Sequence, residues 1–408
     1  MPGLERIALF TKEYPPHVYG GAGVHVEYLS RELARRVPVE IRCFGDQDVR
    51  DGNLRVRGYP MWKDVGEGGD PRHAGAVDAF ARSLAMAKDR LDAEVVHCHT
   101  WYTDMAGLLA SKLWGVPYAL TIHSLEPLRP WKSEQLGRAY QLSLWMERTA
   151  IHEADAVVAV SEETRADVLR LFRIPSERVH VIHNGIDPDE YRRTEASDAL
   201  SRRGVDPARP FVLFVGRIAR QKGILHLVRA IQHLDPSLQV VLCAGAPDTP
   251  EILEEMTALV AEISKSRQGI FWIPEMLPRA EVIQFYSHAA VFCCPSVYEP
   301  FGIINLEAMA CGTPVVASAV GGIKEVVVPG GTGILIEFER REDDFEPVEP
   351  ERFQADLAAA LNRVALDPAL RARFGEAGRR RVEERFSWSA IAERTLALYR
   401  TLVQNRSA

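Results

Sequence analysis

The chain has 408 residues, a length that predicts two or three domains rather than one. Hydrophobic residues make up 47% of it and charged residues 26%, which is typical of a soluble globular enzyme and excludes a disordered chain. The formal net charge of −7 disfavours nucleic acid and anionic membranes as partners, because phosphate-rich surfaces attract basic proteins.

Targeting signals and cysteine usage bear on the compartment. No apolar run is long enough to span a bilayer, and the first residues turn polar too early for a secretory signal. The six cysteines form no C-x-x-C pair, and most of them lie in apolar runs. We therefore expect a cytoplasmic protein with reduced core cysteines.

Short apolar runs alternate with longer helical patterns through the first half of the chain. Strands are predicted over residues 6–10, 37–44, 93–99, 116–123, 154–160 and 178–183, and helices over 23–36 and about 103–114. Alternation of this kind indicates an α/β fold with a parallel sheet, whose doubly buried strands read as continuous apolar runs.

The pattern breaks at residues 184–210, which are polar and rich in Pro and Gly, so a domain boundary is predicted there. A second series of strands follows over 210–216, 238–245, 269–274, 289–295, 313–318 and 333–337. Residues 337–351 are acidic and predict an exposed loop, and the last apolar pattern, from 387 to 404, predicts a terminal helix. The predicted units are residues 1–190, 191–385 and 386–408.

A glycine-rich turn follows the first predicted strand. Gly20, Gly21 and Gly23 permit close approach of the backbone to a ligand, and a helix predicted to begin near Val24 offers free N–H groups. This combination favours an anion, most often phosphate, although a turn without a ligand would have the same sequence. The dinucleotide fingerprint G-x-G-x-x-G is not met, because Val26 stands at its last position.

Two cations follow the first strand of the second half. Arg217 and Lys222 lie five positions apart, just past an apolar run that predicts a buried strand. The carboxyl ends of such strands are where open α/β sheets bind ligands, and an Arg fork with a Lys point charge suits a diphosphate. The alternative is two solvated surface charges.

Two glutamates, Glu299 and Glu307, lie eight positions apart in the stretch SVYEPFGIINLEAMACGTPVV. Glu299 is predicted in a loop and Glu307 inside the helix that begins near Gly302 and Ile303, where N–H groups are again free. Separated carboxylates suit the hydroxyls of a sugar and of a ribose, with the helix N-terminus between them for phosphate. Spacing alone equally fits a capping glutamate and a solvated one.

The motifs taken together resemble a known family. KEYPPHVYGGAGVHVEYLS, HCHTWYTDMAG, TIHSLEPLRPWKSEQLG, VGRIARQKG, LCAGAPDTPE and the E-x7-E stretch occur in order and cover nearly the whole chain. They are similar to retaining glycosyltransferases of family four, and within that family to the actinobacterial-type glycogen synthase branch, which resembles enzymes making α-maltose 1-phosphate.

The resemblance implies the GT-B fold, with two Rossmann-like domains facing a deep cleft and the terminal helix crossing back to the first domain. It implies a glucosyl transfer from ADP-glucose to glucose 1-phosphate or to glycogen, without a cofactor or a metal ion. Residue by residue, Gly20 and Gly21 match the phosphate loop and His123 the histidine near the donor sugar. Arg217 and Lys222 match the diphosphate clamp, and Glu299 and Glu307 the carboxylates for sugar and ribose. The oligomeric state is left open, a homodimer included.

The loop 123–137 is predicted to border the acceptor. Arg129 and Lys132 flank Trp131, so cations for a phosphate lie beside an aromatic surface for a sugar. The alternative is that the two cations pair with Glu126 or Glu134 of the same loop.

Four alternatives stay open at this point. His97 and His99 form an H-x-H that could bind a metal, but no third ligand is evident and a core or cleft role is favoured. An NAD-dependent oxidoreductase is disfavoured by the failed fingerprint and by the E-x7-E. A non-catalytic sensor of nucleotide sugars would not need both the cation pair and both glutamates, and a related transferase with another donor and a small-molecule or lipid acceptor remains the main rival.

Overall fold

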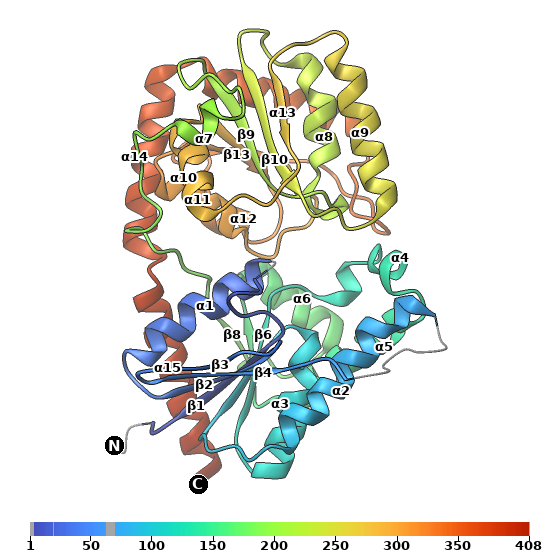
Figure 1. Ribbon diagram of the computed structural model, residues 1–408, viewed down its shortest axis with the longest axis vertical. Helices are drawn as coiled ribbons and strands as arrows, with labels where there is room; N and C mark the ends of the chain where they lie inside the picture. Colours follow the sequence, from blue (N-terminus) through green and yellow to red (C-terminus); the bar gives the residue numbers. More distant parts are fainter. Residues whose placement is uncertain (1–3, 19, 63–69, 408) are drawn as a thin grey trace. The chain divides into compact units, whose positions relative to one another are not determined.

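The computed structural model describes residues 4–18, 20–62 and 70–407 (Figure 1). It divides into two compact units, of which unit 1 comprises Met1–Gly185 and Trp388–Ala408, and unit 2 comprises Ile186–Ser387. The sequence predicted boundaries after residues 190 and 385, close to these. The terminal helix belongs to unit 1, although about two hundred residues of unit 2 precede it in the chain.

Unit 1 is built on an eight-stranded sheet of order β3-β4-β2-β1-β5-β6-β7-β8. All neighbours pair in parallel except β3 and β4, which form an antiparallel hairpin at one edge. The strands are β1 (Ile7–Thr11), β2 (Val39–Phe44), β3 (Asp48–Asp51), β4 (Leu54–Tyr59), β5 (Val96–His99), β6 (Tyr118–Ile122), β7 (Ala156–Ala159) and β8 (Val179–Val181).

Helices cover both faces of this sheet. On one face α1 and α15 pack together over Ile7 and Leu9 of β1, with Leu396 and Tyr399 of α15 in the same apolar cluster. On the other face α3 contacts α2 and α5 (Figure 1). The helices are α1 (Gly21–Ala34), α2 (Ala74–Lys88), α3 (Trp101–Trp114), α4 (Lys132–Leu136), α5 (Ala139–Glu153), α6 (Glu162–Phe172) and α15 (Trp388–Ser407), with short 3-10 turns at Pro71–His73, Glu126–Leu128 and Ser176–Arg178.

Unit 2 is built on a six-stranded, fully parallel sheet of order β11-β10-β9-β12-β13-β14. Its strands are β9 (Phe211–Arg217), β10 (Gln239–Gly245), β11 (Ile270–Ile273), β12 (Val291–Cys294), β13 (Val315–Ser318) and β14 (Gly333–Ile336). They are buried apolar segments, as expected of strands covered on both faces.

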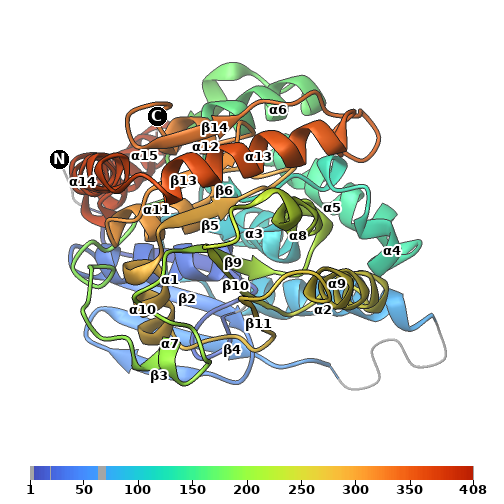
Figure 2. The ribbon, with the colours of Figure 1, turned by 90° about the horizontal axis from the view of Figure 1, so that it is seen from above.

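The helices of unit 2 complete a second three-layer α/β/α structure. α13 lies across β9, β12, β13 and β14 and contacts α8, which also contacts α9 (Figure 2). α11 contacts α10, α12 and α14 as well as β12 and β13. The helices are α7 (Asp198–Ser201), α8 (Ile224–Ala230), α9 (Pro250–Ser264), α10 (Arg279–His288), α11 (Ile303–Ala310), α12 (Ile323–Val326), α13 (Pro350–Ala365) and α14 (Pro368–Arg385), with 3-10 turns at Arg220–Lys222 and Ile231–His233.

The structure confirms the α/β prediction, and every run predicted as a strand contains one. It adds the hairpin of β3 and β4, which was not predicted. It also begins α1 at Gly21, three residues before the predicted start, with Gly20 in extended backbone as the N-cap. Residues 337–349 form an exposed loop, as predicted.

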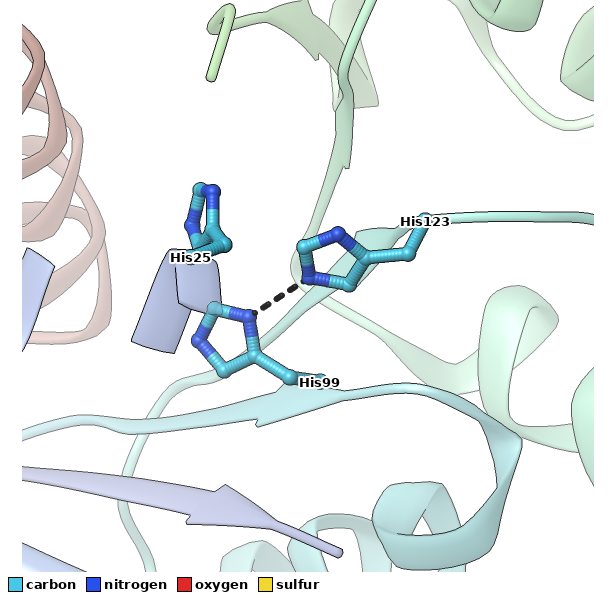
Figure 3. A group of neighbouring side chains, drawn as sticks. All are labelled: His25, His99 and His123. Atoms are coloured by element: carbon cyan, nitrogen blue, oxygen red, sulfur yellow. Dashed lines mark hydrogen bonds between the residues drawn. The ribbon is translucent and has the colours of Figure 1, made fainter. Parts of the chain in front are cut away.

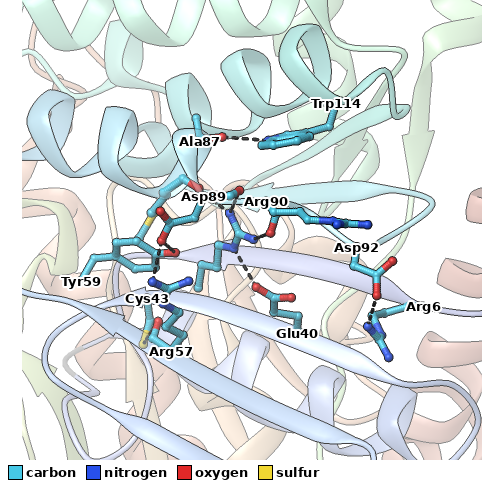
Figure 4. Close-up of polar contacts among 12 residues, drawn as sticks. Arg6, Glu40, Cys43, Arg57, Tyr59, Ala87, Asp89, Arg90, Asp92 and Trp114 are labelled. Atoms are coloured by element: carbon cyan, nitrogen blue, oxygen red, sulfur yellow. Dashed lines mark hydrogen bonds and ion pairs between the residues drawn. The ribbon is translucent and has the colours of Figure 1, made fainter.

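A buried arginine ties the sheet of unit 1 to α2. Arg42 of β2 is fully buried, and its Nε donates to Glu40 Oε1 at 2.8 Å. Its terminal nitrogens donate to the carbonyls of Met86, of Asp89 at 3.0 Å and of Arg90 at 2.7 Å, at the end of α2 (Figure 4). Met86 is in the last turn of α2, Asp89 is its C-cap and Arg90 follows. Carbonyls at and just beyond a helix end have no partner within the helix, so this guanidinium supplies hydrogen bonds that they would otherwise lack.

All six cysteines are free and buried, as predicted. Within the described residues, no helix is both long and apolar enough to cross a membrane.

Candidate functional site

The carboxyl edge of the unit 2 sheet brings two loops together. One loop follows β9 and the other follows the neighbouring strand β12. Gly223 has φ +61°, and a Cβ placed there would lie 2.0 Å from the carbonyl oxygen of Pro295, so only glycine allows this approach. Val297 N also donates to Gln221 O at 3.0 Å. The loops are therefore held in contact by their backbones.

Lys222 and Glu299 meet where these loops touch. Lys222 Nζ lies 2.7 Å from Glu299 Oε2, and the two side chains are only 16% and 8% exposed. Ser296 Oγ also donates to Glu299 Oε2, at 3.1 Å. The predicted cation and the predicted sugar-binding carboxylate are thus one partly buried ion pair, although 77 positions separate them.

Arg217, the second predicted cation, ends β9 and pairs with Asp248. Asp248 follows β10, whose Gly245 lies beside Arg217 in the sheet register. No motif singles out Asp248 among the acids of its loop. Both predicted cations therefore lie at the carboxyl edge of the sheet, and each has a carboxylate beside it.

The N-terminus of α11 opens at the same edge. Gly302 caps the helix with φ +91°, no side chain of the described residues caps the first turn, and that turn contains no acidic residue. The N–H groups of this turn and the dipole of the helix are suited to an anion. Gly302 and Ile303 are thus placed as predicted, after the loop that carries Glu299.

Glu307 lies inside α11 and is held by two tyrosines. Tyr191 donates to its Oε1 at 3.1 Å and Tyr286 to its Oε2 at 2.9 Å. Burial raises the pKa of the Glu307 carboxyl, against the opposing effect of the tyrosine hydrogen bonds. Each carboxylate oxygen has a second lone pair, so these bonds leave acceptor capacity for a ribose hydroxyl. Neither tyrosine was singled out in the sequence.

In unit 1 the glycine-rich turn is occupied by a carboxylate of the protein itself. Gly20 N donates to Glu13 Oε2 at 2.8 Å. A Cβ at Gly23 would lie 2.8 Å from the same oxygen, so glycine there lets the turn close around Glu13. The anion at the start of α1 is a side chain that sequence reasoning missed, and phosphate binding by Gly20 and Gly21 stays a prediction.

Three histidines gather at the carboxyl edge of the unit 1 sheet (Figure 3). His99 ends β5, His123 follows β6 and His25 comes from α1. His99 Nδ1 and His123 Nε2 are 3.1 Å apart, and His25 Nδ1 lies 2.6 Å from Asn184 Oδ1. Burial lowers the pKa of all three rings, that of His25 to about 4, so the cluster is neutral at pH 7.

The histidine cluster is the place in the described chain where a metal ion could be considered. One nitrogen from each of His25, His99 and His123 lies within 4.8 Å of the others. Ligands of a tetrahedral zinc are only about 3.4 Å apart, since each lies about 2.1 Å from the ion. The rings would have to move closer to bind one, and the absence of a metal stays a prediction.

His97, the other histidine of the H-x-H, faces the core. Its Nδ1 lies 2.6 Å from Tyr399 Oη and its Nε2 lies 2.7 Å from Thr121 Oγ1. The core role predicted for the pair therefore applies to His97. No third ligand for the H-x-H was evident in the sequence, and the structure places two further histidines, His123 and His25, beside His99.

The predicted acceptor loop is largely turned inward. Arg129 Nη1 lies 3.3 Å from Glu126 Oε1, and its side chain is 12% exposed. Trp131 is buried, and Lys132 begins α4 and is half-buried. The pairing of Arg129 with Glu126 is the alternative that the sequence left open. A role of Arg129, Trp131 and Lys132 in acceptor binding stays a prediction.

Comparisons with known proteins match both units. The profile described as Glycosyltransferase Family 4 matches residues 19–190, and the one described as Glycosyl transferases group 1 matches residues 200–381. The α-maltose-1-phosphate synthase of Mycolicibacterium smegmatis is 49% identical over 399 residues, which cover 97% of this chain and 99% of that protein.

Two further relatives are more distant. The D-inositol 3-phosphate glycosyltransferase of Xylanimonas cellulosilytica is 32% identical over 413 residues, which cover 95% of this chain and 93% of that protein. Among solved structures, the sucrose-phosphate synthase of Thermosynechococcus elongatus matches with a TM-score of 0.77 and 25% identity, over 98% of this chain and 100% of that one.

Proposed function

The chain belongs to glycosyltransferase family 4 and has the GT-B fold, and from this premise we propose that it transfers glucose from ADP-glucose to glucose 1-phosphate, forming α-maltose 1-phosphate. One observation carries the choice of acceptor. Identity to the mycobacterial synthase is 49% over nearly the full length of both chains, against 32% to the inositol 3-phosphate enzyme.

In this proposal the donor binds at the carboxyl edge of the unit 2 sheet. Arg217 and Lys222 contact the diphosphate, together with the N–H groups at Gly302 and Ile303. Glu299 accepts hydrogen bonds from hydroxyls of the transferred glucose, and Glu307 accepts hydrogen bonds from hydroxyls of the ribose. The ion pairs with Asp248 and Glu299 support these roles, because they hold each cation in one position before a ligand arrives.

The chemistry is a substitution at the anomeric carbon. The bond from that carbon to the diphosphate oxygen breaks, and a bond to a hydroxyl oxygen of the acceptor forms on the same face. The hydroxyl proton passes to the departing diphosphate. Negative charge grows on the diphosphate as its bond breaks, so fixed cations and helix N–H groups stabilise the transition state more than the ground state. These groups meet the charge without a metal ion, so activity should survive a chelator.

Unit 1 supplies the acceptor side and His123. The carboxyl edge of its sheet carries a neutral histidine cluster, which suits contacts with sugar hydroxyls rather than with an anion. Gly20 and Gly21 are proposed to contact donor phosphate. Because Glu13 Oε2 now accepts the Gly20 N–H, the Glu13 side chain must move for that contact to form.

The competing functions differ in acceptor. A glycogen synthase would extend a neutral glucan, and an enzyme like the more distant relative would use inositol 3-phosphate. ADP-glucose offered with glucose 1-phosphate, glycogen and inositol 3-phosphate in competition, with the products separated and identified, tests the proposal. Maltose 1-phosphate as the main product supports it, and glucose transferred mainly to glycogen or to inositol 3-phosphate contradicts it.

The acceptor residues need a test of their own. Glucose 1-phosphate carries a phosphate that a glucan end lacks, so a cation at the acceptor should matter for one substrate and not for the other. The double substitution of Arg129→Ala with Lys132→Ala should raise KM for glucose 1-phosphate and leave that for glycogen unchanged. An equal rise in KM for both acceptors would show that Arg129 acts by holding the loop in place through its ion pair with Glu126.

A further inference from the structure

A cavity of about 920 Å³ lies at the edge of the unit 2 sheet opposite the candidate donor site. It is lined by Pro210, Ala290 and Pro314, which stand just before β9, β12 and β13. Arg217 and Glu299 lie at or beyond the carboxyl ends of β9 and β12. Because these strands are parallel, the cavity and the donor edge are at opposite ends of the same strands.

Arginines dominate the charge of this groove. Its lining carries two carboxylates, Glu376 and Glu383, and six guanidinium groups, so its positive charges outnumber its negative ones by four. The arginines are Arg192, Arg193, Arg209, Arg371, Arg379 and Arg380. Such a concentration of positive charge is unexpected in a chain whose formal net charge is −7.

The arginines divide into structural and available groups. Arg379 pairs with Glu383 at 2.6 Å and also bonds to backbone carbonyls. For Arg192 and Arg380, the structure shows no hydrogen bond or ion pair with any described residue, and both side chains are exposed. Guanidinium forks of this kind bind phosphate oxygens in pairs of parallel hydrogen bonds.

The volume of the groove and the carboxylate of Glu376, which is not paired with Arg379, indicate the class of ligand. The volume suits a small molecule rather than a single phosphate ion. Glu376 would repel a ligand made only of phosphates, but it can accept a hydrogen bond from a hydroxyl. We propose that this groove is a regulatory binding site for a sugar phosphate, distinct from the donor site.

Arg379 connects the groove to the donor edge. Its Nη1 donates to the carbonyls of Ala310 at 2.7 Å and of Tyr191 at 2.9 Å. Ala310 is the last residue of α11, whose N-terminus opens at the donor edge. Tyr191 in turn donates from its hydroxyl to Glu307. A ligand that draws on Arg379 or its neighbours therefore acts on α11 at two points, its last residue Ala310 and, through Tyr191, Glu307.

The first test measures binding by equilibrium dialysis of the whole chain against labelled glucose 6-phosphate. The double variant Arg192→Ala with Arg380→Ala should raise the Kd by about tenfold or more, since each substitution removes a charge-assisted contact. Arg373→Ala, an exposed arginine of the same helix outside the groove, should leave it unchanged. Lys222→Ala should also leave it unchanged, because that substitution affects the donor edge alone.

Competition identifies which part of the ligand is recognised. Inorganic phosphate should displace the label only at a higher concentration than unlabelled glucose 6-phosphate, because it offers Glu376 no sugar hydroxyl, and glucose should not displace it. Absence of saturable binding, or equal Kd values for the wild type and the double variant, would overturn the site. Loss of this binding in Lys222→Ala would assign it to the donor edge instead.

The second test concerns regulation and uses turnover with ADP-glucose. Saturating glucose 6-phosphate should change kcat/KM for the donor by about fivefold or more in the wild type and not in the double variant. Unchanged kinetics at a concentration that fills the groove would overturn the regulatory role. Failure of the proposed acceptor would leave the binding result intact, because dialysis does not depend on catalysis.

Discussion

Acidification from pH 7 to pH 5 should destabilise unit 1 through its buried histidines. Burial lowers the pKa of His25 to about 4 and that of His97 to about 3, from an ordinary value of 6.5. A group whose pKa is lower in the folded state contributes stability above its unfolded pKa and loses it as the pH falls toward the folded one. The loss therefore starts near pH 6.5.

The size of this loss in the free energy of unfolding follows from proton binding, because at pH 5 the histidines are protonated in the unfolded chain and not in the folded one. At pH 5 the solution is about 1.5 units below the unfolded pKa, which corresponds to about 2 kcal/mol for each histidine. His25 and His97 together should remove about 4 kcal/mol, and His99 and His123 act in the same direction. A domain has only about 5–15 kcal/mol to lose.

Urea unfolding at several pH values, followed by tryptophan fluorescence, measures this effect. Six of the seven tryptophans belong to unit 1, and Trp272 alone belongs to unit 2, so the signal reports mainly on unit 1. His25→Gln should reduce the loss between pH 7 and pH 5 by about 2 kcal/mol. His152→Gln, an exposed histidine of the same unit, should not change it. The same pH dependence in the wild type and in His25→Gln would refute the reasoning.

Three other predictions concern catalysis and packing. Arg217→Ala or Lys222→Ala should lower kcat by about 100-fold or more, measured as ADP release, and near-normal turnover would remove that residue from the proposed site. Glu299→Gln should mainly lower kcat and Glu307→Gln should mainly raise KM for ADP-glucose, because the ribose is remote from the bond that breaks; equal effects on both parameters would contradict this division. Arg42→Met should lower the free energy of unfolding by about 3–5 kcal/mol, because a buried carboxylate is left without its cation; a loss below about 1 kcal/mol in thermal or urea unfolding would show that water replaces it.

The fold could be predicted because its strands are buried on both faces and read as apolar runs. The hairpin of β3 and β4 lacks that signal, since β3 is exposed along its whole length. The sequence of the hairpin carries a different signal, an Asp51-Gly52 turn in which the glycine adopts φ +54°. Apolar runs predict only strands that lie in a core.

The cations of the site could be predicted from the sequence, but the residues that pair with them could be predicted less well. Arg217 and Lys222 follow a strand, so their place at the edge is a local property of the sequence. Asp248 is 31 positions from Arg217, and their pairing depends on the register between β9 and β10. His25 reaches the histidine cluster through the packing of α1 on the sheet. Contacts between elements follow from packing that no single stretch of sequence encodes.

The place of α15 in unit 1 has a consequence for synthesis of the chain. Ile186 and Ser387, the two ends of unit 2, lie side by side, with Ile186 N donating to Phe386 O at 2.8 Å, so unit 2 is an insertion within unit 1. On the ribosome, unit 1 lacks the helix that covers α1 and that brings Tyr399 to His97 until the last residues emerge. At about 5–20 residues per second, the intervening segment takes roughly 10–40 s to make. At the end of that interval the inserted unit has its whole sequence and can fold, whereas the unit that began first must still wait for α15, with part of one face of its sheet uncovered.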